Sequence, residues 1–175
     1  MPQPEFIVAD ARVHRPALIE LNVEYVSWVF TEIDQLFGVS MLQIVGTTAR
    51  DYVPTVIDKI CGDAPPKGVF YMVKVGHTLA GMGGLRSLES GVAEIKRVYV
   101  RPEFRGMQLG NAMLKRLLSD ATAFGYQRAR LDTAPFMQAA HRIYERHGFV
   151  DCLPYEGSEV PTEFQARWRF MERAL

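Results

Sequence analysis

The sequence contains few cysteines. Its 175 residues include only Cys61 and Cys152, and neither has a histidine or a second cysteine beside it at the spacing of a metal ligand. This scarcity excludes a disulfide framework and a zinc module. We therefore expect two free thiols, no bound metal and a reducing, cytoplasmic environment.

Long apolar segments are absent too. No run of about eighteen apolar residues occurs, which excludes a membrane-spanning helix. The first sixteen residues contain acids and prolines, where a secretory signal would have a basic segment followed by an apolar one. The sequence predicts a protein that is neither exported nor membrane-bound.

The chain also lacks net charge, because twenty Lys and Arg residues are balanced by twenty Asp and Glu residues. No overall field would attract nucleic acid or an anionic membrane, so neither is expected as a partner. A basic surface around Lys115 and Arg116 could bind nucleic acid, but the neighbouring acids weigh against it. Any phosphate-binding site must be local.

What is present is the composition of an ordinary globular domain, with 48% apolar and 23% charged residues. The length fits one domain over residues 1–175. Hydrophobic periodicity predicts both helices and strands, and we expect them to form an α/β (α+β) fold, a single mixed, mostly antiparallel, twisted sheet flanked by helices. We expect helices at 13–37 (one, or two separated near Thr31), 48–59, 109–124 and 136–147, and strands at 5–10, 69–75, 78–88, 92–100, 128–133, 149–153 and 165–172.

The three central strands form an antiparallel meander in this prediction, with Gly76 and His77 as the first turn. Residues 92–100 alternate between charged and apolar side chains. A regular strand would place Glu94 and Lys96 on one face and Ile95 and Arg97 on the other.

A glycine-containing segment, RGMQLGN at 105–111, joins the strand at 92–100 to the most regular helix. Free backbone N–H groups and the positive end of the helix dipole can hold a pyrophosphate at such a turn. The alternative is a tight structural turn in which Gly110 packs against the sheet.

These segments resemble the GNAT superfamily of N-acetyltransferases over residues 69–149. The resemblance rests on AEIKRVYVRPEFRG at 93–106, the following helix, RLDT at 130–133, and Ala140, Tyr144, Glu145, Arg146, Gly148 and Phe149. It implies a GNAT fold that binds acetyl-CoA (coenzyme A) as co-substrate. The residues that it assigns to the cofactor are Val98, Tyr99, Val100, Arg105, Gly106, Met107, Gln108, Leu109, Gly110 and Asn111.

Within that set, the turn would hold the pyrophosphate, and residues 98–100 would run beside the pantetheine arm. A backbone N–H near Val98 would stabilise the negative charge that develops on the thioester oxygen. Gln108 departs from the family pattern, which has a glycine there. Its side chain either narrows the approach of the phosphate or points to solvent.

The resemblance makes Tyr144 the candidate acid for the leaving thiolate, although a core aromatic is the alternative. Met137 replaces an asparagine that contacts the cofactor in the family. Glu94 and Asp132 are the candidate bases, and Glu94 is preferred because it lies on the strand beside the thioester. An ion pair for Glu94, a turn-stabilising role for Asp132 and a chain of waters are the alternatives.

The function implied is transfer of an acetyl group from acetyl-CoA to a primary amine by direct attack in a ternary complex. The acceptor would be a small molecule or a protein or peptide amine, and a homodimer is possible. We expect it to contact residues 25–37, 89–91 and 154–163, with Glu24, Glu32 and Asp34 as candidate charges. A non-catalytic acyl-CoA-binding sensor is the alternative function, suggested by the changes at Gln108 and Met137.

Overall fold

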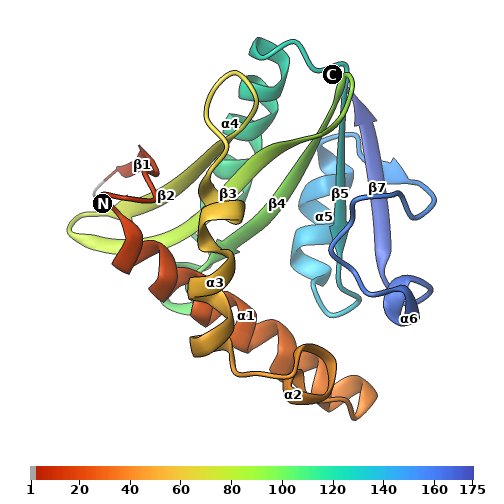
Figure 1. Cartoon of the computed structure of the whole chain (residues 1–175). Helices are drawn as coiled ribbons and strands as arrows, with labels where there is room; N and C mark the ends of the chain where they lie inside the picture. The colour runs from red at the N-terminus through yellow and green to blue at the C-terminus, as the bar shows by residue number, and fades with distance from the viewer. Residues whose placement is uncertain (1–2) are drawn as a thin grey trace.

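A seven-stranded sheet organises the protein in the computed structural model, which describes residues 3–175 (Figure 1). The strand order is β1-β2-β3-β4-β5-β7-β6, and all pairs are antiparallel except β4 with β5. The strands are β1 (Pro4–Val8), β2 (Val69–Val75), β3 (Thr78–Glu89), β4 (Val92–Val100), β5 (Arg128–Thr133), β6 (Val150–Asp151) and β7 (Arg169–Ala174). The predicted mixed sheet and its central meander are confirmed.

Helices cover both faces of this sheet. The α-helices are α1 (Arg15–Phe37), α2 (Met41–Val45), α3 (Ala49–Cys61), α4 (Leu109–Ala123), α5 (Gln138–Arg146) and α6 (Thr162–Gln165). The buried side chains of α1 and α3 pack with Phe70, Met72 and Met82 of the sheet, whereas those of α4 pack with Tyr71, Val73 and Ile95 on the other face. Between residues 3 and 175, no helix is both long and apolar enough to cross a membrane.

The strands β4 and β5 separate after a short parallel contact. Their pairing runs only from Val92 with Arg128 to Glu94 with Arg130. Both strands continue past this point, and Figure 1 shows them diverging towards their C-terminal ends. In the described sheet, the second half of β4 therefore keeps backbone groups on its β5 side that no strand pairs.

The prediction that Arg97 lies on the same face of the strand as Ile95 is wrong. Residues 82–84 of β3 face residues 96–99 of β4 with a shift in register, and Arg97 has a positive φ of 54°. This bulge adds one residue to β4 and reverses the alternation. Arg97 consequently points to the same face as Lys96, towards α1, while Ile95 remains on the α4 face.

Several element boundaries also differ from the prediction. The first helix is continuous through Thr31, whose hydroxyl donates to the Ser27 carbonyl within it. The short helix α2 was not predicted. Residues 165–168 end α6 and form a turn instead of starting the last strand, because Phe164 and Trp168 pack into an apolar cluster with α1.

Candidate active site

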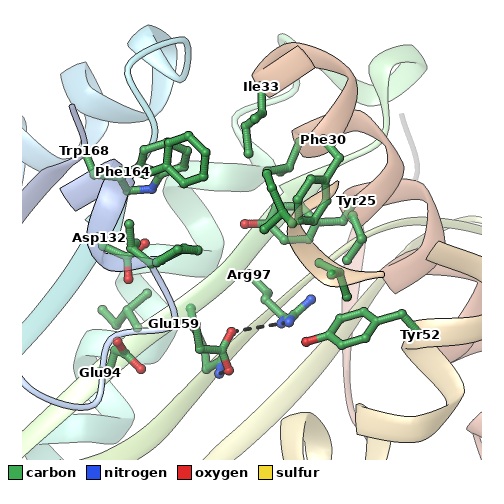
Figure 2. Close-up of a pocket in the computed structure, with 18 residues that line it drawn as sticks. Tyr25, Phe30, Ile33, Tyr52, Glu94, Arg97, Asp132, Glu159, Phe164 and Trp168 are labelled. Carbon is green, nitrogen blue, oxygen red and sulfur yellow. Dashed lines mark hydrogen bonds and ion pairs between the residues drawn. The ribbon is translucent and has the colours of Figure 1, made fainter. Parts of the chain in front are cut away.

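A cavity of about 220 Å³ lies where α1, α2 and the loop before α6 meet β4 and β5 (Figure 2). Most of its wall is apolar or aromatic. These residues are Tyr25, Val26, Val29, Phe30, Ile33, Ile44, Val45, Tyr52, Ile95, Val160, Pro161, Phe164 and Trp168. Its charged side chains are Glu94, Lys96, Arg97, Asp132 and Glu159. The cavity thus combines an apolar interior with a small group of titratable side chains.

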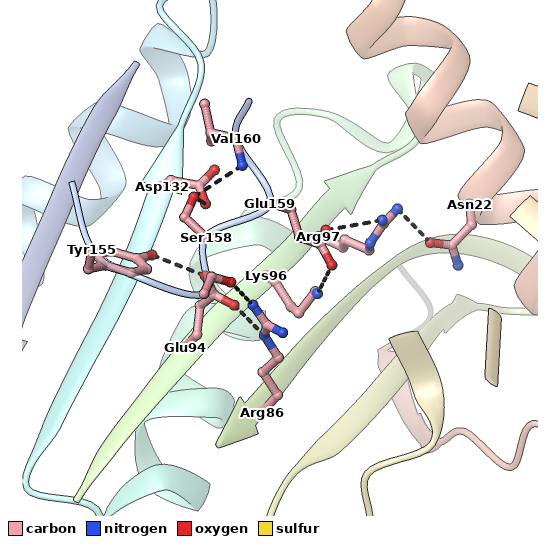
Figure 3. A network of polar contacts seen from close by, with 11 residues as sticks. Asn22, Arg86, Glu94, Lys96, Arg97, Asp132, Tyr155, Ser158, Glu159 and Val160 are labelled. Atoms are coloured by element: carbon pink, nitrogen blue, oxygen red, sulfur yellow. Dashed lines mark hydrogen bonds and ion pairs between the residues drawn. The ribbon is translucent and has the colours of Figure 1, made fainter. Parts of the chain in front are cut away.

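Two cations of β4 share one carboxylate of the loop (Figure 3). Glu159 accepts from Lys96 Nζ at 2.7 Å and from Arg97 Nη2 at 3.4 Å. Burial opposes the charge of Glu159, but these two cations lower its pKa to about 2. Arg97 also donates from Nη1 to the Asn22 side chain at 3.2 Å, and its Nε has no acceptor among residues 3–175. Glu159 therefore stays ionised.

Glu94 is also paired. It is only 2% exposed, it accepts from Arg86 Nε in a short ion pair, and it accepts from the Tyr155 hydroxyl at 3.1 Å. Arg86 in turn donates to the Gly157 carbonyl at 2.6 Å, which ties the loop to β3. The ion pair that sequence reasoning offered as the alternative role of Glu94 is present.

Asp132 differs from these two carboxylates. It lies on β5, it accepts one hydrogen bond, from the Ser158 hydroxyl at 3.2 Å, and it has no ion-pair partner among residues 3–175. Burial and the neighbouring charge of Glu94 raise its pKa from 3.8 to about 7, while the Ser158 hydrogen bond and Lys96 act in the opposite direction. A carboxyl group with that pKa exchanges a proton near neutral pH.

Tyr144 is buried on α5 and does not line this cavity. Its ring packs edge-to-face against Phe149 at a centroid distance of 5.9 Å, within the cluster on the α4 side of the sheet. Burial, followed by the nearby groups Tyr25 and Asp132, raises the pKa of its hydroxyl. The structure thus brings Glu94 and Asp132 together at one cavity and places the ring of Tyr144 in the cluster on the α4 side of the sheet, outside the cavity wall.

The turn before α4 has the backbone shape of an anion site. Gly106 and Gln108 both have positive φ, at 86° and 61°. Gln108 therefore adopts the left-handed conformation that a glycine would favour, and its side chain is exposed. At the start of α4, the N–H groups of the first turn have no partner within the helix. Of the two alternatives for this side chain, the structure favours the solvent-facing one.

Space near this turn is open. A Cβ atom placed on Gly106 would meet nothing within 4 Å, and one on Gly110 would meet only Ile143 Cδ1 at 3.6 Å. Asn111 is held by a hydrogen bond between its Oδ1 and His147 Nε2 at 2.7 Å. The backbone at these two glycines is thus not covered by neighbouring side chains, which a site for a pyrophosphate at a helix N-terminus requires.

The unpaired half of β4 connects the turn to the cavity. Val98 and Val100 pack on the α4 side, and Tyr99 packs on the α1 side against Tyr25 and Trp28. Their side chains are used in the core, so an extended ligand would meet the backbone of β4 along its open edge. The predicted residues 98–100 fit a pantetheine arm in this respect.

Sequence reasoning found only part of the cavity wall. Of the predicted acceptor segments, α1 and the loop at 154–163 line the cavity, whereas residues 89–91 do not. The predicted charges Glu24, Glu32 and Asp34 are not in its wall, and Glu24 is paired with Arg101. Arg97 and Trp168 of the wall were missed, as was Arg86, the partner of Glu94. Tyr155, Ser158 and Glu159 were included only as part of the segment 154–163, without an individual role. The motif at 93–106 contains Arg97, but nothing in the sequence marked the bulge.

The family-model comparison matches the Acetyltransferase (GNAT) family over residues 23–149. The chain belongs to this family. It is 33% identical over 100 residues to an N-acetyltransferase of Schizosaccharomyces pombe and 31% identical over 113 residues to an IAA acetyltransferase of Azospirillum brasilense. The matched regions cover 56% and 64% of this chain, and 61% and 71% of those relatives, so the S. pombe protein is matched over less than two thirds of its length.

Solved structures share the whole fold at low identity. An acetyltransferase from Streptococcus agalactiae superposes with a TM-score of 0.70 and 20% identity, covering 98% of both chains. A spermidine N-acetyltransferase from Vibrio cholerae, in complex with CoA and spermine, gives 0.63 and 16%, covering 98% of this chain and 95% of that one. The predicted GNAT fold is confirmed.

Proposed function

We propose that this protein transfers an acetyl group from acetyl-CoA to a primary amine by direct attack. The observation that carries the proposal is the separation of β4 from β5, which connects the anion-binding turn at residues 105–110 to the cavity containing Asp132. A thioester lying along the open edge of β4 and an amine in the cavity would meet at this opening. Holding two reactants together in this way supplies much of the rate enhancement of such a reaction.

Asp132 is the better candidate for the base. Glu94 is tied to Arg86 and Tyr155, so protonating it would remove the anionic partner of a half-buried cation. Asp132 has no such cation within residues 3–175, and its pKa of about 7 lets it take a proton from an ammonium group and release it to water. In this assignment Glu94 acts as a positioning residue that keeps the pKa of Asp132 high.

The proposed reaction balances as follows. Asp132 removes one proton from the substrate ammonium, and the amine nitrogen then forms a bond to the acetyl carbon. The bond between that carbon and sulfur breaks, and Tyr144 gives its proton to the sulfur, directly or through water. The second proton of the nitrogen restores the Tyr144 hydroxyl. A backbone N–H near Val98, in the half of β4 that β5 does not pair, would stabilise the negative charge on the oxygen.

The cofactor part of the proposal is tested by binding. Acetyl-CoA should raise the melting temperature of the protein by mass action, and Gly110→Asp should abolish that rise. A Cβ fits at Gly110, and an acid in the first turn of a helix is compatible with the helix dipole, so the variant should fold. Its carboxylate would repel a pyrophosphate. Gly110→Ala is the matched control and should keep the rise.

Catalysis is tested by incubating the protein with acetyl-CoA and a set of primary amines, and measuring the acetylated product by mass spectrometry. Product formation at the rate of thiol release supports the proposal. Binding of acetyl-CoA without acetylation of any amine would contradict it, and would favour a non-catalytic acyl-CoA sensor.

A further inference from the structure

The charges of the cavity are unevenly matched. Three carboxylates line it, and two of them have cationic partners: Glu94 with Arg86, and Glu159 with Lys96 and Arg97. Asp132 is the carboxylate that lacks an ion pair within residues 3–175. The two cations of the wall, Lys96 and Arg97, are both paired with Glu159. The cavity therefore has one carboxylate available for a ligand cation.

The rest of the wall offers little to a second charge. Helix α1 contributes Val26, Val29, Phe30 and Ile33, and the segment at α6 contributes Phe164 and Trp168. Figure 2 shows Phe30 and Ile33 on one side of the space and Phe164 and Trp168 on the other. A second ammonium buried there without a partner would lose its hydration and gain no compensating charge, so its binding would be unfavourable. A ligand carboxylate would lie near Asp132 and Glu159 and would compete with Glu159 for cations that are already paired.

The volume of the cavity limits the size of the apolar group that a ligand can place in it. Its volume of about 220 Å³ exceeds the roughly 150 Å³ of an apolar protein cavity that holds benzene. One ring with a short alkyl chain would fit. A long polyamine would extend out of the cavity.

We infer that the acceptor is an apolar primary monoamine, an aromatic or branched alkylamine whose ammonium group pairs with Asp132. This inference rests on the proposed function and names its substrate class. The aromatic wall holds the apolar part by burying it, and Asp132 both binds the ammonium and removes its proton. The paired state of Glu159 makes the site selective against a second charge of either sign.

Matched pairs of amines test this selectivity. Phenethylamine and phenylalanine differ by a carboxylate, and pentylamine and cadaverine differ by a second ammonium. In competition for a limiting amount of acetyl-CoA, the ratio of acetylated products gives the ratio of kcat/KM. We expect the apolar member of each pair to be favoured by at least about tenfold. Preference for phenylalanine or for cadaverine would overturn the inference while leaving the acetyltransferase proposal intact.

A variant provides a second test. Val45, on α2, is half-buried and lines the cavity. Val45→Glu adds to Asp132 a second carboxylate without a cationic partner, and Val45→Gln is the neutral control of the same shape. We expect the Glu variant to acetylate cadaverine, relative to pentylamine, about tenfold better than the Gln variant does. Equal ratios in the two variants would contradict the view that the charge balance of this cavity selects the acceptor.

A binding measurement separates the two proposals. Calorimetry with phenethylamine and the CoA-loaded protein should show binding that is weakened at least about tenfold in Asp132→Asn. Binding without acetylation would overturn the proposed activity but support the ligand class. No binding of phenethylamine or pentylamine, with acetylation of another class of amine, would overturn the inference alone.

Discussion

Replacing Asp132 by asparagine should change how the rate depends on pH. An amine with a pKa near 10 is only about one-thousandth neutral at pH 7, so catalysis at that pH depends on a base. With a pKa of about 7, Asp132 is half ionised at pH 7 and mostly ionised at pH 8. In the native protein, kcat/KM for total amine should therefore rise to about pH 7 and then level off.

An asparagine side chain cannot take a proton, so Asp132→Asn should use only the free amine. Its kcat/KM should rise about tenfold for each pH unit up to the pKa of the amine. The loss relative to the native protein should approach about 10³ at pH 7 and shrink to about tenfold at pH 9. Initial rates of thiol release from pH 6 to 9.5, with phenethylamine, measure both profiles. A loss that is constant across this range, or a plateau retained in the variant, would refute Asp132 as the base.

The same substitution should stabilise the protein at alkaline pH. Because the folded state raises the pKa of Asp132 from 3.8 to about 7, the native protein binds more protons than the unfolded chain between these values. Its free energy of unfolding should thus fall as pH rises from 4 to 7, by at most about 4 kcal/mol from this group. Urea unfolding should show Asp132→Asn to be more stable than the native protein above pH 7, with the difference vanishing near pH 4. A pH-independent difference would contradict the raised pKa.

Four further substitutions test neighbouring parts of the site. Ser158→Ala removes a hydrogen bond that lowers the pKa of Asp132, so the acidic limb of the kcat/KM profile should move to higher pH. Glu94→Gln removes a negative charge that raises this pKa, so the limb should move to lower pH. A limb that moves in neither variant would show that the limb does not report the protonation of Asp132. Tyr144→Phe should lower turnover by roughly 10² to 10⁴ with little change in acetyl-CoA affinity, and unchanged turnover would make Tyr144 a core aromatic. Gln108→Gly removes the side chain from a residue in the left-handed conformation, so it should raise the free energy of unfolding, measured in urea, by about 1 kcal/mol. The affinity for acetyl-CoA should change by less than about threefold. A lower free energy of unfolding would contradict the strain assigned to this position.

The periodic parts of the fold could be predicted from the sequence. The helix α4 and the strands β2, β3 and β4 have apolar spacings that match their geometry, and short turns join the three strands. Asp132 could be found because it ends a short strand within a recognisable motif. The turn at residues 105–111 could be placed because glycines stand between a strand and a regular helix.

The contacts that control the carboxylates could not be predicted. Tyr155, Ser158 and Glu159 belong to a loop without periodicity, and their partners lie 26 to 63 residues away in the chain. The bulge at Arg97 involves no glycine or proline in β4, so the alternation rule placed its side chain on the wrong face. The preference for Glu94 as base came from its strand alone, without knowledge of the ion pair to Arg86.

The most direct test of the central claim is the stoichiometry of acetyl transfer to an apolar monoamine. Purified protein is incubated with acetyl-CoA and phenethylamine at pH 7.5, and N-acetylphenethylamine and free coenzyme A are quantified by mass spectrometry in the same samples. We predict equal amounts of the two products, formed at a rate that Asp132→Asn reduces at least about hundredfold. Release of coenzyme A without acetylated amine, or equal rates in the native protein and the variant, would contradict the account.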